Sequence, residues 1–221
     1  PTRFTDACDV ENPTCETCCK DATCDVEAYD SNKNLDFSGR DGCVCYEGSL
    51  TKPNRKVTGS KYADCLFVGG DYATVEGGAG DDDIIVFGEF GNAKGGGGDD
   101  SIVMAKGGSK AGKLVTKAKA FGGSGADAIE VMGSFTEARG GDGDDAIRAA
   151  AADSKTRLKE VLLFGEAGDD ELTASVAKNS QVFGGAGQDT INVFDAGSMT
   201  VNGGGNADSI VAQSLVDSEG Y

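Results

Sequence analysis

The sequence contains no histidine or tryptophan, only 3 prolines, and aromatic residues make up only 7% of it. This composition provides few large side chains for a conventional globular core. Because histidine is absent and Tyr221 is the only tyrosine after Tyr72, few candidates for a general base remain. No apolar run approaches the roughly 20 residues of a membrane-spanning helix. We therefore expect a soluble chain that is not an enzyme.

Positive charge is also scarce. The chain has 20 lysine and arginine residues against 37 aspartate and glutamate residues, which gives a net charge of −17. This balance argues against a nucleic-acid partner, because phosphate binding needs a basic surface. Where carboxylates recur at one position beside glycines, neutralisation by bound cations is favoured.

Glycine, in contrast, is abundant, and its 35 residues recur with a period. Seven segments follow the pattern Gly-Gly-x-Gly-x-Asp-x-aliphatic, starting at Gly77, Gly95, Gly122, Gly140, Gly165, Gly184 and Gly203. Two depart once each, with Glu166 at the second glycine and Asn206 at the third. A degenerate copy at Gly59 keeps Asp64 and Leu66. The starts lie 18 to 27 residues apart, and the base period of 18 suits a solenoid rung of two strands and two turns.

The side chains after each turn alternate with the period of two that is typical of a strand. The first aliphatic ladder consists of Ile84, Ile102, Ile129, Ile147, Leu172, Ile191 and Ile210. The returning strands supply Val75, Ala93, Ala120, Ala138, Leu163, Val182 and Val201. The sequence thus predicts an all-β fold, a right-handed parallel β-solenoid or β-roll with about 18 residues per rung and a thin core.

The repeated turn resembles that of the RTX (repeats-in-toxin) family over roughly two-thirds of the chain. The resemblance implies a β-roll in which aspartates and main-chain carbonyls hold Ca²⁺ between adjacent rungs. The implied ligands are Asp82, Asp100, Asp127, Asp145, Asp170, Asp189 and Asp208. The implied carbonyls lie near Gly78, Gly80, Gly96, Gly98, Gly123, Gly125, Gly141, Gly143, Gly168, Gly185, Gly187 and Gly204. Seven turns give up to about six Ca²⁺ sites, and we expect folding to require calcium.

The chain departs from that family because only one edge carries the calcium turn, whereas irregular loops are expected opposite. Those loops hold most of the positive charge of the repeats. Five lysines are candidates for docking an acidic partner or polysaccharide: Lys106, Lys110, Lys113, Lys117 and Lys119. The alternative is a solvated basic edge that keeps the chain soluble.

All eight cysteines lie in the first third of the chain: Cys8, Cys15, Cys18, Cys19, Cys24, Cys43, Cys45 and Cys65. An even number in a short segment predicts a disulfide framework. A reduced zinc site is the alternative. We expect a disulfide-stapled cap over residues 1–58, a calcium-binding solenoid over 59–215 and a tail over 216–221.

A polar loop in the predicted cap has the spacing of an EF-hand-like calcium loop. Its candidate ligands are Asp30, Asn32, Asn34, Asp36 and Asp41. Leu35 stands where such a loop needs glycine, and no helices are evident on either side. A polar surface turn is the alternative interpretation.

These features together favour a non-enzymatic, calcium-dependent rigid rod in a surface, matrix or lumenal assembly with a protein or polysaccharide partner. Self-assembly through a poorly capped solenoid end is a further expectation. The alternatives are a carbohydrate lyase or epimerase, and a carbohydrate- or mineral-surface binding module. Disulfides predict a secreted or cell-surface location, or else an oxidising lumenal or periplasmic compartment.

Overall fold

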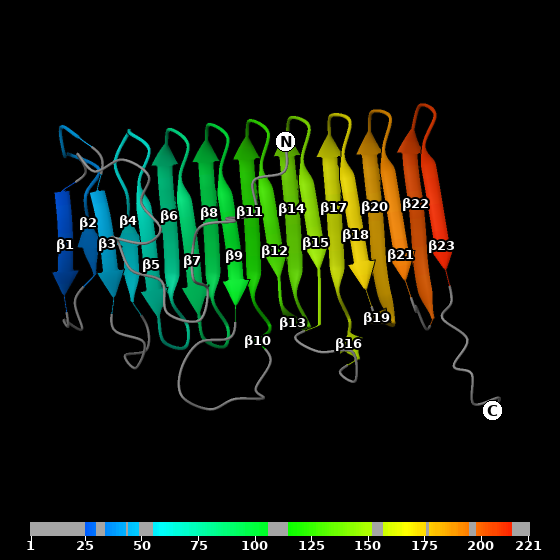
Figure 1. Ribbon diagram of the computed structural model, residues 1–221, viewed down its shortest axis with the longest axis horizontal. Helices are drawn as coiled ribbons and strands as arrows, with labels where there is room; N and C mark the ends of the chain where they lie inside the picture. Colours follow the sequence, from blue (N-terminus) through cyan, green and yellow to red (C-terminus); the bar gives the residue numbers. More distant parts are fainter. Residues whose placement is uncertain are drawn as a thin grey trace.

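The computed structural model describes residues 25–29, 34–42, 44–48, 55–105, 115–151, 157–175, 177–194 and 198–213. None of these residues is helical, so no helix among them could span a membrane. Strands stack side by side along one long axis in coils, and the chain passes from one sheet to the other within each coil (Figure 1). The predicted all-β parallel solenoid is confirmed.

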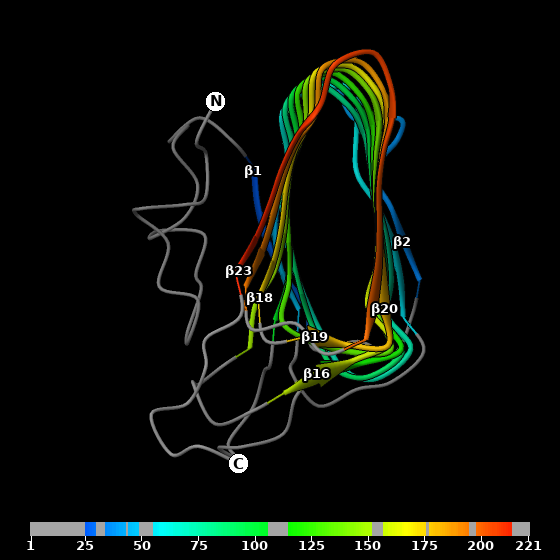
Figure 2. The ribbon, with the colours of Figure 1, turned by 90° about the vertical axis from the view of Figure 1, so that its right-hand side faces the viewer.

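Two parallel sheets face each other across the core (Figure 2). The ten-stranded sheet contains, in spatial order, β1 (Asp25–Tyr29), β3 (Val44–Gly48), β5 (Cys65–Gly69), β7 (Asp83–Phe87), β9 (Ser101–Ala105), β12 (Ala128–Val131), β15 (Ala146–Ala149), β18 (Glu171–Ser175), β21 (Thr190–Phe194) and β23 (Ser209–Gln213). The nine-stranded sheet contains β2 (Leu35–Asp36), β4 (Lys56–Thr58), β6 (Thr74–Ala79), β8 (Asn92–Gly97), β11 (Lys119–Ser124), β14 (Glu137–Asp142), β17 (Leu162–Ala167), β20 (Ser180–Ala186) and β22 (Met199–Gly205).

Four short strands line one edge of the solenoid. They form two parallel pairs, β10 (Val115–Thr116) with β13 (Gly133–Ser134), and β16 (Leu158–Lys159) with β19 (Ala177–Lys178). This edge lies opposite the glycine-rich turns, at the bottom of Figures 1 and 2.

The core consists of the predicted aliphatic ladders. Ile129 is in register with Ile102 on one side and with Ile147 on the other, and all three side chains are buried. Ala120 and Ala138 are likewise in register across β11 and β14. Because each coil contributes only a few inward side chains, the core is a narrow column of small apolar contacts that extends the length of the solenoid.

The coils begin before Gly59, within the segment that the sequence assigned to the cap. Strands β1 and β3 pair in parallel, β3 pairs with β5, and β2 and β4 continue the other sheet. These early coils lack the glycine-rich motif, which is why the repeat pattern did not reveal them. The described part of residues 25–58 therefore forms coils of the same solenoid.

Two of the eight cysteines lie in the described residues. Cys45 and Cys65 are in register on β3 and β5, and they cluster with Phe67, Ile85 and Phe87 away from the main core. Neither cysteine is a free thiol. The other six, Cys8, Cys15, Cys18, Cys19, Cys24 and Cys43, lie outside the described residues.

Candidate metal-binding edge

The seven glycine-rich turns stack on one another at a single edge of the solenoid, at the top of Figure 2. The second glycine of the repeat has a positive φ, 132° at Gly123 for example. A Cβ atom there would lie 2.1 Å from the carbonyl oxygen of Gly96 in the preceding coil. Only glycine permits this close backbone approach, which explains the residue type at that position.

The motif aspartates form a continuous hydrogen-bond ladder inside these turns. Each aspartate's backbone N–H donates to the Oδ1 atom of the aspartate in the next coil, over distances of 2.7 to 3.1 Å. The ladder runs from Asp64 to Asp208. The structure thus brings the predicted ligand residues together in one row, one carboxylate per coil.

The second oxygen of these carboxylates has no such partner. Within the described part of the chain, Oδ2 is buried and accepts no hydrogen bond in six aspartates: Asp82, Asp100, Asp127, Asp145, Asp170 and Asp189. It lies against the first glycine of its own turn, where a Cβ on Gly77 would come within 2.2 Å of it. The carbonyl oxygen of Gly95, in the next coil, lies beside the same point.

Burial raises the pKa of these carboxyl groups. It raises the pKa of Asp82 to about 9, of Asp100 and Asp145 to about 8, of Asp170 to about 7 and of Asp127 to about 6. Desolvation is the largest cause, and neighbouring carboxylates add repulsion. A buried row of this kind needs either protons or a cation to compensate its charge.

The donor set fits a hard cation. Carboxylate and carbonyl oxygens are the ligands that Ca²⁺ prefers, and Ca²⁺ takes six to eight of them. Among the described residues, no group of three or more Asp, Glu, His or Cys side chains is assembled to hold a metal. Main-chain carbonyls, such as those of the first glycines, would therefore have to supply most of the ligands to each ion.

The first and last members of the row differ from the six. Asp64 accepts hydrogen bonds from Val44 N (2.6 Å) and from the Ser60 side chain (3.0 Å). Its carboxylate therefore has more hydrogen-bond donors than those of the six interior aspartates. Asp208, in the last described coil, is only partly buried. The interior aspartates are thus the better candidates for metal ligands.

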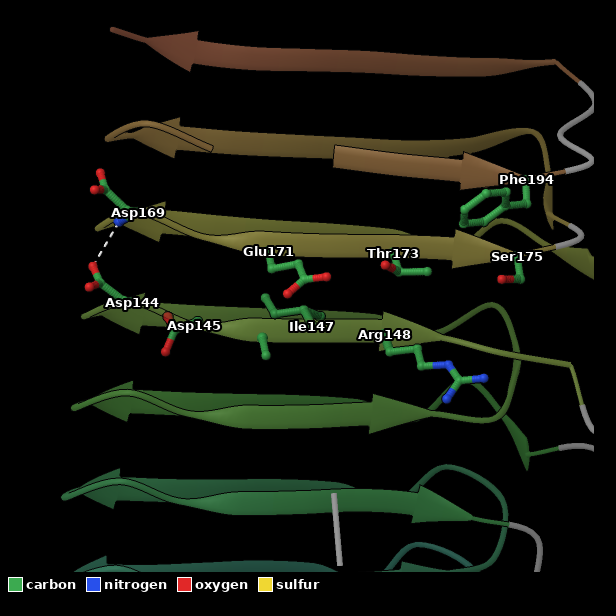
Figure 3. A pocket seen from close by; sticks show the side chains of 10 residues that line it. Asp144, Asp145, Ile147, Arg148, Asp169, Glu171, Thr173, Ser175 and Phe194 are labelled. Carbon is green, nitrogen blue, oxygen red and sulfur yellow. Dashed lines mark hydrogen bonds between the residues drawn. The ribbon is translucent and has the colours of Figure 1, made fainter. Parts of the chain in front are cut away.

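A second ladder of carboxylates lies next to the first and faces solvent. Asp144 accepts a hydrogen bond from the backbone N–H of Asp169 at 2.8 Å (Figure 3), and Asp81 accepts one from that of Asp99 at 3.0 Å. These bonds run toward the preceding coil, opposite in direction to the buried ladder. The exposed aspartates are therefore stacking residues whose carboxylates are already engaged.

A hollow of about 490 Å³ adjoins this edge on the outer face of β15 and β18 (Figure 3). Glu171, Thr173 and Arg148 line its middle, and Phe194 closes one end. The Arg148 guanidinium lies 3.8 Å from the carboxylate of Glu130. The hollow combines charged, hydroxyl and aromatic groups, and it adjoins the glycine-rich turns through Asp145.

The other predicted sites are only partly described. The Asn34 side-chain oxygen accepts the Lys56 N–H at 3.0 Å, Asp36 accepts the Ser38 N–H at 3.0 Å, and Asp41 lies 3.7 Å from the Lys61 ammonium. Asp30 and Asn32 lie outside the described residues. The described members of the EF-hand-like loop thus each have a separate partner.

The predicted lysine cluster is also only partly described. Lys106, Lys110 and Lys113 lie outside the described residues. Lys117 is exposed and lies over the Phe90 ring, whereas Lys119 forms an ion pair with Glu137 at 2.7 Å. The two described lysines therefore contribute less free positive charge than the sequence indicated.

No protein-family model, curated protein or solved structure matches this chain. Its function must therefore be argued from its own residues.

Proposed function

We propose that this protein is a calcium-binding, non-enzymatic rod of the RTX β-roll type that acts in an extracytoplasmic surface, matrix or lumenal assembly. The observation that carries the proposal is the row of six buried aspartate Oδ2 atoms without hydrogen-bond partners in the described residues. Ions bound between coils would compensate these charges and join each coil to the next. The protein would then be rigid only when loaded with calcium.

The thin core supports this coupling. Many inward side chains are alanine, for example Ala93, Ala120 and Ala138, so each coil buries little apolar surface. An uncompensated buried carboxylate costs several kcal/mol, and six in a row would exceed what such a core provides. Calcium binding therefore has to be part of the folding free energy at neutral pH.

A calcium titration tests the proposal directly. The protein, stripped with a chelator at pH 7.5, should show a coil-to-β transition in circular dichroism on addition of Ca²⁺, and isothermal titration calorimetry should count several ions per chain. Mg²⁺ should be much weaker, because it demands a smaller octahedral site. A β spectrum that does not respond to chelator or to Ca²⁺ would overturn the proposal.

Two adjacent aspartates provide a matched pair of variants. Asp145→Asn removes a buried ligand charge and should lower the number of bound ions by one or two, since its carboxylate lies between coils. Asp144→Asn alters the exposed neighbour, whose carboxylate already accepts a backbone hydrogen bond, and should leave the stoichiometry unchanged. Equal effects of the two substitutions would show that the buried row does not hold the calcium.

An oxidising compartment is part of the same proposal. It is supported by the clustering of the cysteines and by the finding that neither Cys45 nor Cys65 is a free thiol. Intact-mass measurement after alkylation without reduction should find no labelled cysteine in the natively produced protein. Labelling of Cys15, Cys18 and Cys19 would instead favour the reduced zinc site.

A further inference from the structure

The edge opposite the glycine-rich turns has a regular structure of its own. One residue in each of six coils has a left-handed backbone, with φ between 51° and 63°: Tyr72, Phe90, Lys117, Phe135, Glu160 and Asn179. These residues stack in register, since Tyr72 N–H donates to Glu89 O (2.8 Å) and Phe135 N–H donates to Lys159 O (2.7 Å). They form the corner at which the chain enters the nine-stranded sheet.

Aromatic residues are a costly choice for this corner. A left-handed backbone is unfavourable for a non-glycine residue, and asparagine tolerates it best, as at Asn179. Nevertheless Tyr72 is 51% exposed and Phe135 is 41% exposed, so each ring leaves a large part of its surface accessible to a ligand. Backbone strain of this kind is typical of functional surfaces.

Two of these aromatic rings also stack on each other. Tyr72 and Phe90 stack with their ring centroids 4.6 Å apart and their planes at 3°, and the Lys117 ammonium lies 5.5 Å from the centre of the Phe90 ring. The spacing follows the separation of neighbouring strands, about 4.8 Å. The corner thus presents three aromatic rings in four successive coils, with Lys117 between Phe90 and Phe135.

A second row lies beside the first, two residues further along each coil on the outer face of the nine-stranded sheet. Its members are in register through β6, β8, β11, β14, β17 and β20: Thr74, Asn92, Lys119, Glu137, Leu162 and Gln181. Between the two rows, around Phe135 and Leu162, lies a hollow of about 420 Å³. Glu160, Asn179 and Gln181 also line this hollow. We call the two rows together the corner stripe.

The corner stripe carries no net charge. It contains two lysines, Lys117 and Lys119, and two glutamates, Glu137 and Glu160. Lys119 and Glu137 form an ion pair. The Lys119 ammonium also holds the pKa of Glu137 below its usual range, so this carboxylate is ionised and accepts hydrogen bonds. Amide and carboxylate groups next to exposed rings can bind hydroxyl groups and C–H faces, but they do not select for an ionic polymer.

We propose that the corner stripe binds a linear, uncharged polysaccharide that lies along the axis of the rod. At the hollow, the Phe135 ring and the Leu162 side chain would contact sugar C–H faces, while Asn179, Gln181 and Glu160 would hydrogen-bond to hydroxyl groups. This inference deepens the binding role proposed above and rests on it.

The test uses calcium-loaded, full-length protein and defined probes. Neutral hexasaccharides, of β-1,4-linked glucose and β-1,4-linked N-acetylglucosamine, are titrated by calorimetry beside a sulfated hexasaccharide of the heparin type. The proposal expects a neutral probe to bind and the sulfated one to bind at least about tenfold more weakly. Preference for the sulfated probe, or no neutral probe bound at millimolar concentration, overturns it.

A variant pair then locates the site. Phe135→Asn suits the left-handed backbone, so the melting temperature should stay the same or rise by a few degrees while affinity for the neutral probe falls about tenfold or more. Tyr62→Asn removes an equally exposed ring (40%) in the turn that precedes Asp64, and should leave binding within about twofold. Equal losses in both variants contradict the assignment.

The two proposals fail separately. A calcium-induced β transition without binding of a neutral probe would overturn the proposed polysaccharide site at the corner stripe and would support the proposed calcium-dependent fold. Binding of a neutral probe that persists in chelator would overturn the proposed calcium requirement and would support the proposed polysaccharide site at the corner stripe.

Discussion

Glu166 occupies the second position of its turn, where the other six complete repeats have glycine with φ between 110° and 132°. Its own φ is 84°, closer to the left-handed region that a side chain can adopt. In return, its carboxylate accepts a hydrogen bond from the Arg139 guanidinium at 2.8 Å, on a partly exposed surface where such pairs contribute little. Glu166 is therefore a strained residue with weak compensation.

Replacing this residue should stabilise the protein. We expect Glu166→Gly to raise the free energy of unfolding by about 0.5–1 kcal/mol, because relief of the strained backbone outweighs one exposed ion pair. Urea unfolding in calcium-saturated buffer measures this. Glu171→Gly, in an exposed position of β18, is the matched control and should lower stability by a similar amount. Destabilisation by both substitutions would show that the strain at Glu166 is negligible.

The turn is the element that permits the coils to stack. A Cβ atom on Gly123 would lie 2.1 Å from a backbone oxygen of the neighbouring coil, whereas a Cβ on Gly97 would meet only the Ser124 hydroxyl at 3.3 Å. Gly123→Ala should therefore cost at least about 3 kcal/mol, through the clash and the positive φ. Gly97→Ala should change stability by less than about 1 kcal/mol, since Ala79 occupies the equivalent position of another coil.

Thermal unfolding in saturating calcium, followed by circular dichroism, separates these two alanine variants. Similar melting temperatures for Gly123→Ala and Gly97→Ala would mean that the turns can move apart. The close backbone approach between neighbouring turns would then not limit the residue type at Gly123.

The predictable part of this fold depends on features that repeat along the chain. The Ile102, Ile129 and Ile147 ladder and the aspartate row could both be read from the spacing, because each coil repeats the same inward and turn positions. The sequence could not predict that the Oδ2 atoms lack hydrogen-bond donors. Whether a carboxylate oxygen has a hydrogen-bond partner depends on atomic positions in two neighbouring coils. Register, not composition, determines that.

The opposite corner was predictable in part. Gly70-Asp71-Tyr72 and Gly88-Glu89-Phe90 share a glycine-acidic-aromatic pattern at a spacing of 18 residues, and Gly133-Ser134-Phe135 partly repeats it. The lysines in the adjacent loops drew the interpretation toward a basic edge instead. Lys119 is paired with Glu137, whereas Lys106, Lys110 and Lys113 lie outside the described residues, so the docking prediction for these lysines stays a prediction.

At the scale of the whole molecule, the buried row makes stability depend on pH in the absence of calcium. Because the pKa values of these aspartates are raised, up to about 9 for Asp82, the folded state binds more protons than the unfolded chain above pH ~4. The free energy of unfolding must then fall as pH rises toward 9. In chelator we expect a folded β form near pH ~4 that is lost by pH ~8.

Calcium should abolish this dependence, because the cation replaces the protons between coils. Urea unfolding curves from pH 4 to 9, in chelator and in saturating Ca²⁺, compare the two conditions. A calcium-free protein that becomes more stable as pH rises would contradict the protonated row. The proposed calcium requirement for folding would therefore apply at neutral and alkaline pH.

Each strand of the two large sheets pairs only with its counterparts in the coils before and after it, so the backbone hydrogen bonds lie along the long axis. A pull that peels one strand away from its neighbour breaks their hydrogen bonds one after another, so the molecule can open coil by coil. A force across the axis, parallel to the strands, shears all the bonds between two coils at once. The rod is therefore mechanically anisotropic, stronger against shear between two coils than against the peeling of one coil from the next.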